Sequence, residues 1–295
     1  MPTTRRGGVV LAEQRHPSRT RKLVTRLVLL LFVAGLAVAG VVGARGLITN
    51  FGGPRCQATA AGASVDFDPS QTAYAATIEA VAEKRGLPAR AATIAIATAI
   101  QESKLRNLKY GDRDSVGLFQ QRPSQGWGTV AQILDPVYAS NKFYDALVKI
   151  DGYEDMRITE IAQKVQKSAY PEAYADHETE GRLLASTLSG HSPEGMGCRL
   201  DDATSGDPAA LKSALAKELG VKATVTGRSL TVKAGSERAA WSAGAYAVAK
   251  ASVHGATAVQ VGSREWTRTR DSSGWEWHDA KKRRGATTVT VTFAP

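Results

Sequence analysis

One stretch near the start of the chain limits what the whole protein can be. Residues 27–44 read LVLLLFVAGLAVAGVVGA, eighteen residues without a charge, bounded by Arg26 and Arg45. A helix of that length measures about 27 Å, close to the hydrocarbon thickness of a bilayer, so the stretch predicts a transmembrane helix. The alternative is a cleaved signal peptide with its cleavage site at Ala37-Val38-Ala39. We favour the membrane helix because the apolar stretch is longer than a typical signal-peptide core.

Basic residues predict how this helix is oriented. The formal net charge of the chain is +10; residues 1–26 hold seven bases and one acid, residues 27–198 sum to −2 and residues 199–295 to +6. The positive-inside rule therefore predicts a cytoplasmic tail at 1–26 and a single-pass protein of the cell membrane whose later domains are extracellular. Because the largest share of the excess charge lies inside the cell, we expect no nucleic-acid partner. A single span without ionisable residues argues against a transporter.

Two cysteines, Cys56 and Cys198, lie on the predicted outer side. Exported proteins meet oxidising conditions, so we expect a disulfide between them, with two unpaired thiols as the alternative. The five histidines are scattered, and no Cys/His cluster has the spacing of a metal site. The sequence therefore predicts neither a metal nor another cofactor.

Composition divides the rest of the chain into segments. Residues 45–69 are small and turn-forming and indicate a linker. Residues 70–198 carry helix signals, among them a nearly all-apolar helix that ends near Gln101. Residues 199–208 indicate a second linker, and residues 209–295 alternate between helix and strand patterns. The expected fold class is multidomain, with a single N-terminal transmembrane helix, a mainly α domain and a small α+β domain at the C-terminus.

The sharpest chemical feature follows the apolar helix. Glu102 and Ser103 come at its end, ahead of an irregular stretch rich in Gly, Asp and Ser. Partial burial disfavours the charged form of a carboxyl, so a Glu that emerges from a buried helix can stay protonated near neutrality. Such a group can act as the general acid in the cleavage of a glycosidic bond.

Two motifs in order resemble the paired signature of lytic transglycosylases and goose-type lysozymes: Glu102-Ser103 and Gly117-Leu118-Phe119-Gln120. Met is commoner in that family at the position of Phe119. The Gly-Asp-Arg loop of goose-type lysozymes is similar to Gly111-Asp112-Arg113. The resemblance covers about residues 70–190 and implies a lysozyme-like domain there.

In that family a Glu protonates the glycosidic oxygen, and transglycosylases need no second carboxylate because groups of the sugar itself complete the reaction. The resemblance therefore implies that Glu102 is the catalytic acid and base. It also implies a sugar groove along the Gly117–Phe119 backbone and Gln120. The full set of candidate substrate-binding residues is Ser103, Asp112, Gly117, Leu118, Phe119, Gln120, Gln121, Trp127 and Tyr170.

Several of these candidates have a second interpretation. Asp112 and its neighbour Asp114 either position a water for an inverting hydrolysis or cap turns of their loop. Trp127 either stacks on a sugar ring or anchors the loop to the core. Tyr170 lies in Ala169-Tyr170-Pro171, which is similar to the family's third motif, Ala-Tyr-Asn. Pro171 replaces the Asn and removes a hydrogen bond expected there.

The sequence thus predicts a membrane-anchored, extracytoplasmic enzyme that cleaves the β-1,4 bonds of peptidoglycan, as a muramidase or a lytic transglycosylase. The alternative is a catalytically weak or inactive wall-binding or scaffold protein of a cell-envelope or secretion assembly. The expected partners are peptidoglycan glycan strands, the cytoplasmic membrane through residues 27–44, and an envelope protein bound by residues 209–295. In that last segment tryptophans alternate with basic residues, and we favour a solvated hairpin with core tryptophans over a wall-binding surface.

Overall fold

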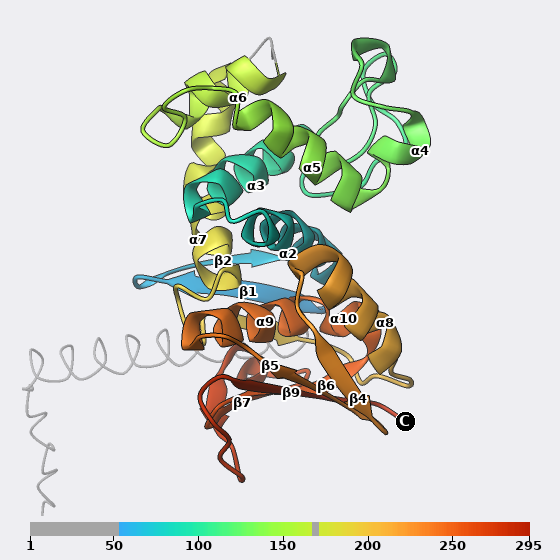
Figure 1. Ribbon diagram of the computed structural model, residues 1–295, viewed down its shortest axis with the longest axis vertical. Helices are drawn as coiled ribbons and strands as arrows, with labels where there is room; N and C mark the ends of the chain where they lie inside the picture. Colours follow the sequence, from blue (N-terminus) through green and yellow to red (C-terminus); the bar gives the residue numbers. More distant parts are fainter. Residues whose placement is uncertain (1–52, 167–170) are drawn as a thin grey trace, which may run out of the picture. The chain divides into compact units, whose positions relative to one another are not determined.

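The computed structural model describes residues 53–166 and 171–295 (Figure 1). The predicted cytoplasmic tail (1–26), the predicted transmembrane helix (27–44) and Tyr170 lie outside the described residues. Residues 53–295 form one compact unit that has its own hydrophobic core, as a segment that folds independently does. Within the part that is described, no helix is both long enough and apolar enough to cross a membrane.

A three-stranded antiparallel sheet of order β2-β1-β3 opens this unit. Strands β1 (Arg55–Ala60) and β2 (Ala63–Phe67) form a hairpin, and both residues of its Ala61-Gly62 turn have positive φ. Strand β3 (Met196–Arg199) pairs with β1, and the register sets Cys56 opposite Cys198. The two cysteines form a buried disulfide, which confirms the predicted bridge.

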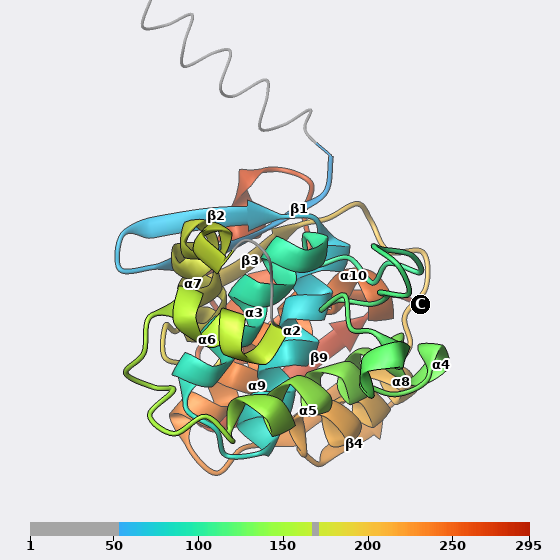
Figure 2. The ribbon, with the colours of Figure 1, turned by 90° about the horizontal axis from the view of Figure 1, so that it is seen from above.

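Helices form the upper part of the molecule in Figure 1. Their bounds are Pro69–Lys84 (α2), Ala89–Ser103 (α3), Val130–Ile133 (α4), Pro136–Leu147 (α5), Ile158–Gln166 (α6) and Glu178–Leu188 (α7). A capping box of Asp68 and Gln71 begins α2, and the Asp135 side chain caps α5. Helix α3 is central, and every residue from 91 to 100 is buried (Figure 2). The structure thus places the predicted apolar helix inside a layer of other helices.

A six-stranded antiparallel sheet of order β4-β5-β9-β6-β7-β8 forms the lower layer in Figure 1. Its strands are β4 (Ala223–Thr226), β5 (Ser229–Lys233), β6 (Ala256–Val261), β7 (Arg264–Thr267), β8 (Trp277–Asp279) and β9 (Thr288–Phe293). Helix α9 (Glu237–Ala249) lies between this sheet and α2. Three shorter elements accompany it: α8 (Pro208–Ala214), the π-helical turn η3 (Leu215–Leu219) and α10 (Ala251–His254).

Apolar side chains at alternate positions along these strands form the core under α9. One cross-strand row of buried side chains spans five strands of the sheet and consists of Leu230, Val291, Val259, Trp266 and Trp277. Successive side chains along a strand point to opposite faces of the sheet, so the neighbours of these residues along each strand face away from α9. Two of the tryptophans of this segment therefore belong to the core, in line with the favoured interpretation.

A buried ion pair joins the helical segment to the C-terminal segment. The Lys250 ammonium lies 3.2 Å from Glu218 Oε2. Lys250 also donates to the Thr77 hydroxyl of α2 at 2.6 Å, and Thr77 donates to Glu218 at 2.9 Å. Tyr246 of α9 donates a further bond to Glu218 at 2.8 Å. Because breaking a buried pair leaves an uncompensated charge, this network holds α2, η3 and α9 in fixed relative positions.

The expected fold class is wrong. The expected mainly helical domain ends in a strand, β3, and residues 55–67 of the expected linker supply the other two strands of its three-stranded sheet. The C-terminal segment carries six strands, and α9 packs on α2 within one compact unit. The reason is physical: the buried positions of β1 are the small Cys56 and Ala58, which produce little hydrophobic alternation. Its partner β3 lies about 140 residues away along the chain, beyond the reach of a local pattern.

Candidate functional site

The end of α3 presents the candidate catalytic carboxyl. Glu102 follows the buried stretch 91–100 and is itself half-buried. The chain then turns through Lys104 and Leu105, whose φ angles of 55° and 54° lie in the left-handed region. Gln71 of α2 donates to the Lys104 carbonyl oxygen at 2.6 Å. This bond holds the turn that follows Glu102, since a carbonyl at a helix end needs a partner from outside the helix.

A tyrosine that the sequence analysis did not select contacts this carboxyl. Tyr174 belongs to η2 (Pro171–His177), a 3₁₀ helix that leads into α7, and its side chain is fully buried. Its hydroxyl donates a hydrogen bond to Glu102 Oε1 at 2.5 Å. The Ala-Tyr pair recognised at Ala169-Tyr170 recurs four residues later as Ala173-Tyr174. That repetition is the signal that could have identified Tyr174, whereas the role of Tyr170 stays a prediction.

Ser103 and Gly117 hold the following loop against the end of α3. The buried Ser103 hydroxyl donates to the Leu118 carbonyl oxygen at 2.7 Å. The Gly117 N–H donates to the Leu108 carbonyl oxygen at 2.7 Å. Gly117 has a φ of 83°, and a Cβ there would lie 2.9 Å from the Ile133 carbonyl oxygen, so only glycine fits. The two motif segments recognised in the sequence are therefore in direct contact.

Two of the candidate groove residues point into the core. Leu118 and Phe119 are fully buried, and the Phe119 ring stacks on Phe143 of α5 with ring centroids 4.7 Å apart. Gln121 is buried as well, and its Nε2 donates to the Ala139 carbonyl oxygen at 3.4 Å. Phe119 and Gln121 fasten the loop to α5, and Leu118 is buried in the core, so any contact of this stretch with a ligand falls to its backbone and to Gln120.

Gln120 is half-buried, with a φ of 47°. Its Nε2 donates to the Gly117 carbonyl oxygen at 3.2 Å and to the Tyr110 carbonyl oxygen at 3.4 Å. Gly111 packs against the side-chain amide of Gln120. A Cβ at position 111 would lie 1.8 Å from Gln120 Oε1, so a larger residue does not fit there. The Tyr110 side chain beside it is exposed. Gln120 is thus held in one orientation by two backbone carbonyl groups.

Asp112 and Asp114 stabilise the loop itself. Asp112 pairs with Arg122 at 2.6 Å. Asp114 accepts hydrogen bonds from the Ser124 N–H at 2.8 Å and from its hydroxyl at 3.0 Å, and these bonds lower the pKa of the Asp114 carboxyl. Trp127 is half-buried and packs against the core. The Asp114 contacts are those of a loop cap and the Trp127 packing is that of a loop anchor, whereas Asp112 is held by an ion pair.

Comparison with models of known protein families gives no match, and no curated protein matches the chain. The resemblance to lytic transglycosylases therefore depends on the motif residues themselves. Within residues 53–166 and 171–295, no group of three or more His, Cys, Asp or Glu side chains is arranged to hold a metal ion.

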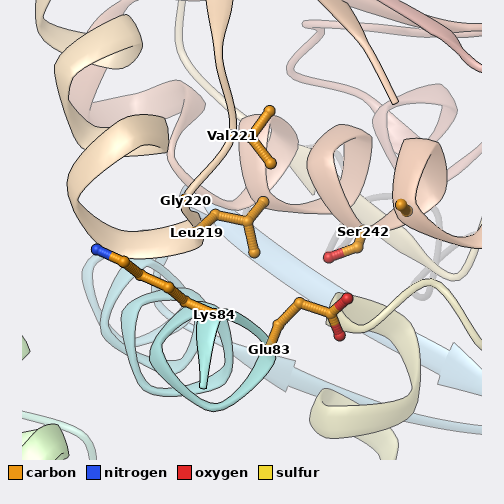
Figure 3. Close-up of a pocket in the computed structure, with 7 residues that line it drawn as sticks. Glu83, Lys84, Leu219, Gly220, Val221 and Ser242 are labelled. Atoms are coloured by element: carbon orange, nitrogen blue, oxygen red, sulfur yellow. The ribbon is translucent and has the colours of Figure 1, made fainter. Parts of the chain in front are cut away.

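One pocket lies between α2 and α9, and a second, bordered by α2, the start of α3 and Arg238, shares Glu83 with it; Glu102 lines neither of them. The first, of about 360 Å³, is lined by Glu83 of α2 and by Ser242 of α9, with Val221 on another wall. Figure 3 shows the Glu83 carboxylate and the Ser242 hydroxyl extending from facing helices into this space. The second pocket, of about 310 Å³, shares Glu83 and is also lined by Glu79 and Arg238.

Glu79 is a buried carboxyl in the wall of the second pocket. Only 3% of the Glu79 surface is exposed to solvent. Burial and the nearby Glu83 carboxylate raise the pKa of Glu79 from 4.5 to about 8, against an opposing effect of Arg238. Arg238 itself is held by Glu83 through two hydrogen bonds of 2.6 and 3.0 Å. Glu79 therefore keeps its proton at neutral pH and makes the contact of α2 with α9 sensitive to alkaline pH.

Proposed function

We propose that the protein is an extracytoplasmic enzyme that cleaves the β-1,4 glycosidic bonds of peptidoglycan, with Glu102 as its catalytic acid and base. The observation that carries the proposal is the position of Glu102 at the end of a buried helix, with Tyr174 bonded to its carboxyl. The Gly117–Gln120 loop is held to the same helix end through Ser103. The buried disulfide supports a location outside the reducing cytoplasm.

In the proposed reaction the protonated Glu102 carboxyl gives its proton to the glycosidic oxygen while the bond from that oxygen to C1 of the sugar breaks. The 6-hydroxyl of the same sugar then bonds to C1 and passes its proton to the Glu102 carboxylate. The product is a 1,6-anhydro sugar, and the enzyme returns to its starting state. We favour this route over hydrolysis because Asp112 and Asp114 are already bonded to Arg122 and Ser124 within their own loop.

Digestion of purified sacculi tests the proposal. We expect the full chain to release soluble muropeptides with 1,6-anhydro ends, as identified by mass spectrometry. Reducing ends in their place would show hydrolysis and overturn the favoured route, while leaving the role of Glu102 intact. Protein that pellets with sacculi and releases no soluble product would instead support the alternative, a wall-binding or scaffold protein.

The partners follow from the proposal. Glycan strands of peptidoglycan are the substrate. Attachment to the membrane through residues 27–44 concerns a segment outside the described residues, and it stays a prediction, as does an envelope partner for residues 209–295.

The Tyr174→Phe variant is expected to lower muropeptide release by about tenfold or more, because a hydrogen bond to a charged group contributes about 1.5–3 kcal/mol. The pH-rate profile should also move to higher pH, since a hydroxyl donor favours the ionised carboxyl. Release rates measured from pH 4 to pH 9 check both expectations.

Tyr144→Phe is the matched control for this variant. Tyr144 is also fully buried, and its hydroxyl donates at 2.9 Å to the backbone carbonyl of Ile78, not to a carboxyl. Its loss is expected to lower thermal stability without moving the pH-rate profile. A Tyr174→Phe profile that coincides with that of the wild type would exclude Tyr174 as a positioning residue of Glu102.

A further inference from the structure

Many basic side chains of the C-terminal segment are already neutralised. Five of them form ion pairs: Lys217–Asp135, Arg238–Glu83, Lys250–Glu218, Arg264–Glu194 and Arg270–Asp201. Arg268 donates to three backbone carbonyl groups. The positive excess of residues 199–295 must therefore come from other bases, and most of these gather at one place.

That place is the connection between β8 and β9, which contains Lys281-Lys282-Arg283-Arg284. In Figure 1 this dark red connection extends from the side of the sheet opposite α9. Gln260 of β6 donates to the Lys282 carbonyl oxygen at 2.7 Å, and the Arg284 N–H donates to the Gly262 carbonyl oxygen at 3.0 Å. The four basic residues are exposed although their backbone is anchored to the sheet. The anchored backbone therefore presents the four side chains to solvent at one place.

Two further bases lie at the same end of the sheet. Lys233 ends β5, opposite Thr288 of β9, and its ammonium donates to the Thr288 hydroxyl at 2.8 Å. Lys222 directly precedes β4, which pairs with β5. We call these six residues the basic sheet end: Lys222, Lys233, Lys281, Lys282, Arg283 and Arg284. None of them forms an ion pair with an acid among the residues that the structure describes.

The acids near this end offset it only in part. Arg264 binds both Glu194 and Asp279, so these three side chains keep one negative charge. Glu265 of β7, 3.8 Å from His278 of β8, adds a second, and six bases still leave a positive excess. Like charges gathered at one end of a sheet repel one another, and a polyanion with regularly spaced charges would relieve that repulsion.

We propose that the basic sheet end binds an anionic polymer of the cell wall that carries repeating phosphate groups. Lys and Arg side chains are the usual donors to phosphate oxygens. A buried disulfide is typical of proteins in oxidising compartments, and such a location favours a wall polymer over nucleic acid. This proposal is independent of Glu102, because it would hold for an enzyme and for a binding protein alike.

Fluorescence anisotropy of labelled poly(glycerol phosphate) tests this proposal. Residues 53–295 are titrated alone, because they form one compact unit and because the seven bases of residues 1–26 would also bind a polyanion. The test variant is Lys281→Gln/Lys282→Gln/Arg283→Gln. The matched control is Lys149→Gln/Arg182→Gln/Lys212→Gln, which removes the same charge from three exposed bases elsewhere.

We expect the wild type to bind with an affinity that falls as salt rises, and the test variant to bind about tenfold or more weakly with a shallower salt dependence. The control should stay within about twofold of the wild type. Equal losses in both variants, or no binding by the wild type in low salt, would overturn the proposal. Equal or tighter binding of poly(glutamate) or of single-stranded DNA would overturn the assignment to a phosphate-bearing wall polymer. Circular dichroism shows whether both variants keep the fold.

Discussion

The Glu102→Gln variant is expected to release muropeptides from purified sacculi about 10²–10⁴-fold more slowly than the wild type, the range that a general acid contributes. Gln has nearly the shape of Glu but has no acidic proton to give to the glycosidic oxygen. Its amide oxygen still accepts the hydrogen bond that Tyr174 donates to Glu102 Oε1. The end of α3 should therefore keep its geometry, and the loss should appear in the reaction rate.

A pelleting assay and a matched substitution separate chemistry from binding in this experiment. The Glu102→Gln variant should still pellet with sacculi and unfold at the wild-type temperature. Glu276→Gln removes an exposed carboxyl of the C-terminal segment and should leave release unchanged. Release by Glu102→Gln at the wild-type rate would remove Glu102 from the reaction and leave the resemblance to transglycosylases without a catalytic residue.

The second large effect is expected for Glu79→Gln and depends on pH. The folded protein holds the Glu79 proton with a pKa of about 8, whereas the ordinary pKa is 4.5. The contribution of Glu79 to stability should therefore be largest below about pH 4.5. This contribution to the free energy of unfolding should fall by about 1.4 kcal/mol per pH unit toward pH 8. Gln does not titrate, so the variant should lack this slope and should gain about 4 kcal/mol on the wild type between pH 4 and pH 8.

Urea unfolding of residues 53–295 from pH 5 to pH 9, with the disulfide intact, measures this difference. Glu160→Gln is the control because Glu160 is an exposed carboxyl of α6. Its variant should keep the wild-type slope. If wild type and Glu79→Gln showed parallel curves across this range, Glu79 would not be the titrating group at the contact of α2 with α9.

Helices could be predicted from the sequence more completely than strands. Asp135 with Pro136 marks a helix start by local chemistry, and the structure begins α5 there. The sequence also predicts a helix from Gln71 with its cap at Pro69-Ser70, and the structure begins α2 two residues earlier, with Asp68 as the cap. Strands β1 and β3 depend on each other, and their hydrogen bonds join residues far apart in sequence. Strands β7 and β8 contain few apolar residues besides Trp266 and Trp277, so they lack the alternation of apolar and polar residues that predicts a strand.

The candidate site was predicted in part for a similar reason. Glu102 could be selected because a helix end and a loop motif are both local in sequence. Tyr174 reaches Glu102 across 72 positions, so its role depends on how η2 packs against α3. The sequence predicts that Phe119 lines the sugar groove, but its ring is buried and stacks on Phe143. A position in a motif does not show whether its side chain faces a groove or the core.

The disulfide determines how the chain would carry mechanical load. Cys56 and Cys198 lie opposite each other on paired strands, and 142 positions of sequence separate them. Tension between the N-terminal part of the chain and the C-terminal sheet would pass through the covalent sulfur bridge. The helices that hold Glu102 and Tyr174 form a closed loop outside this path. If the protein were pulled from both ends, the force would therefore bypass the candidate site. After reduction of the bridge, the same force would act on α3.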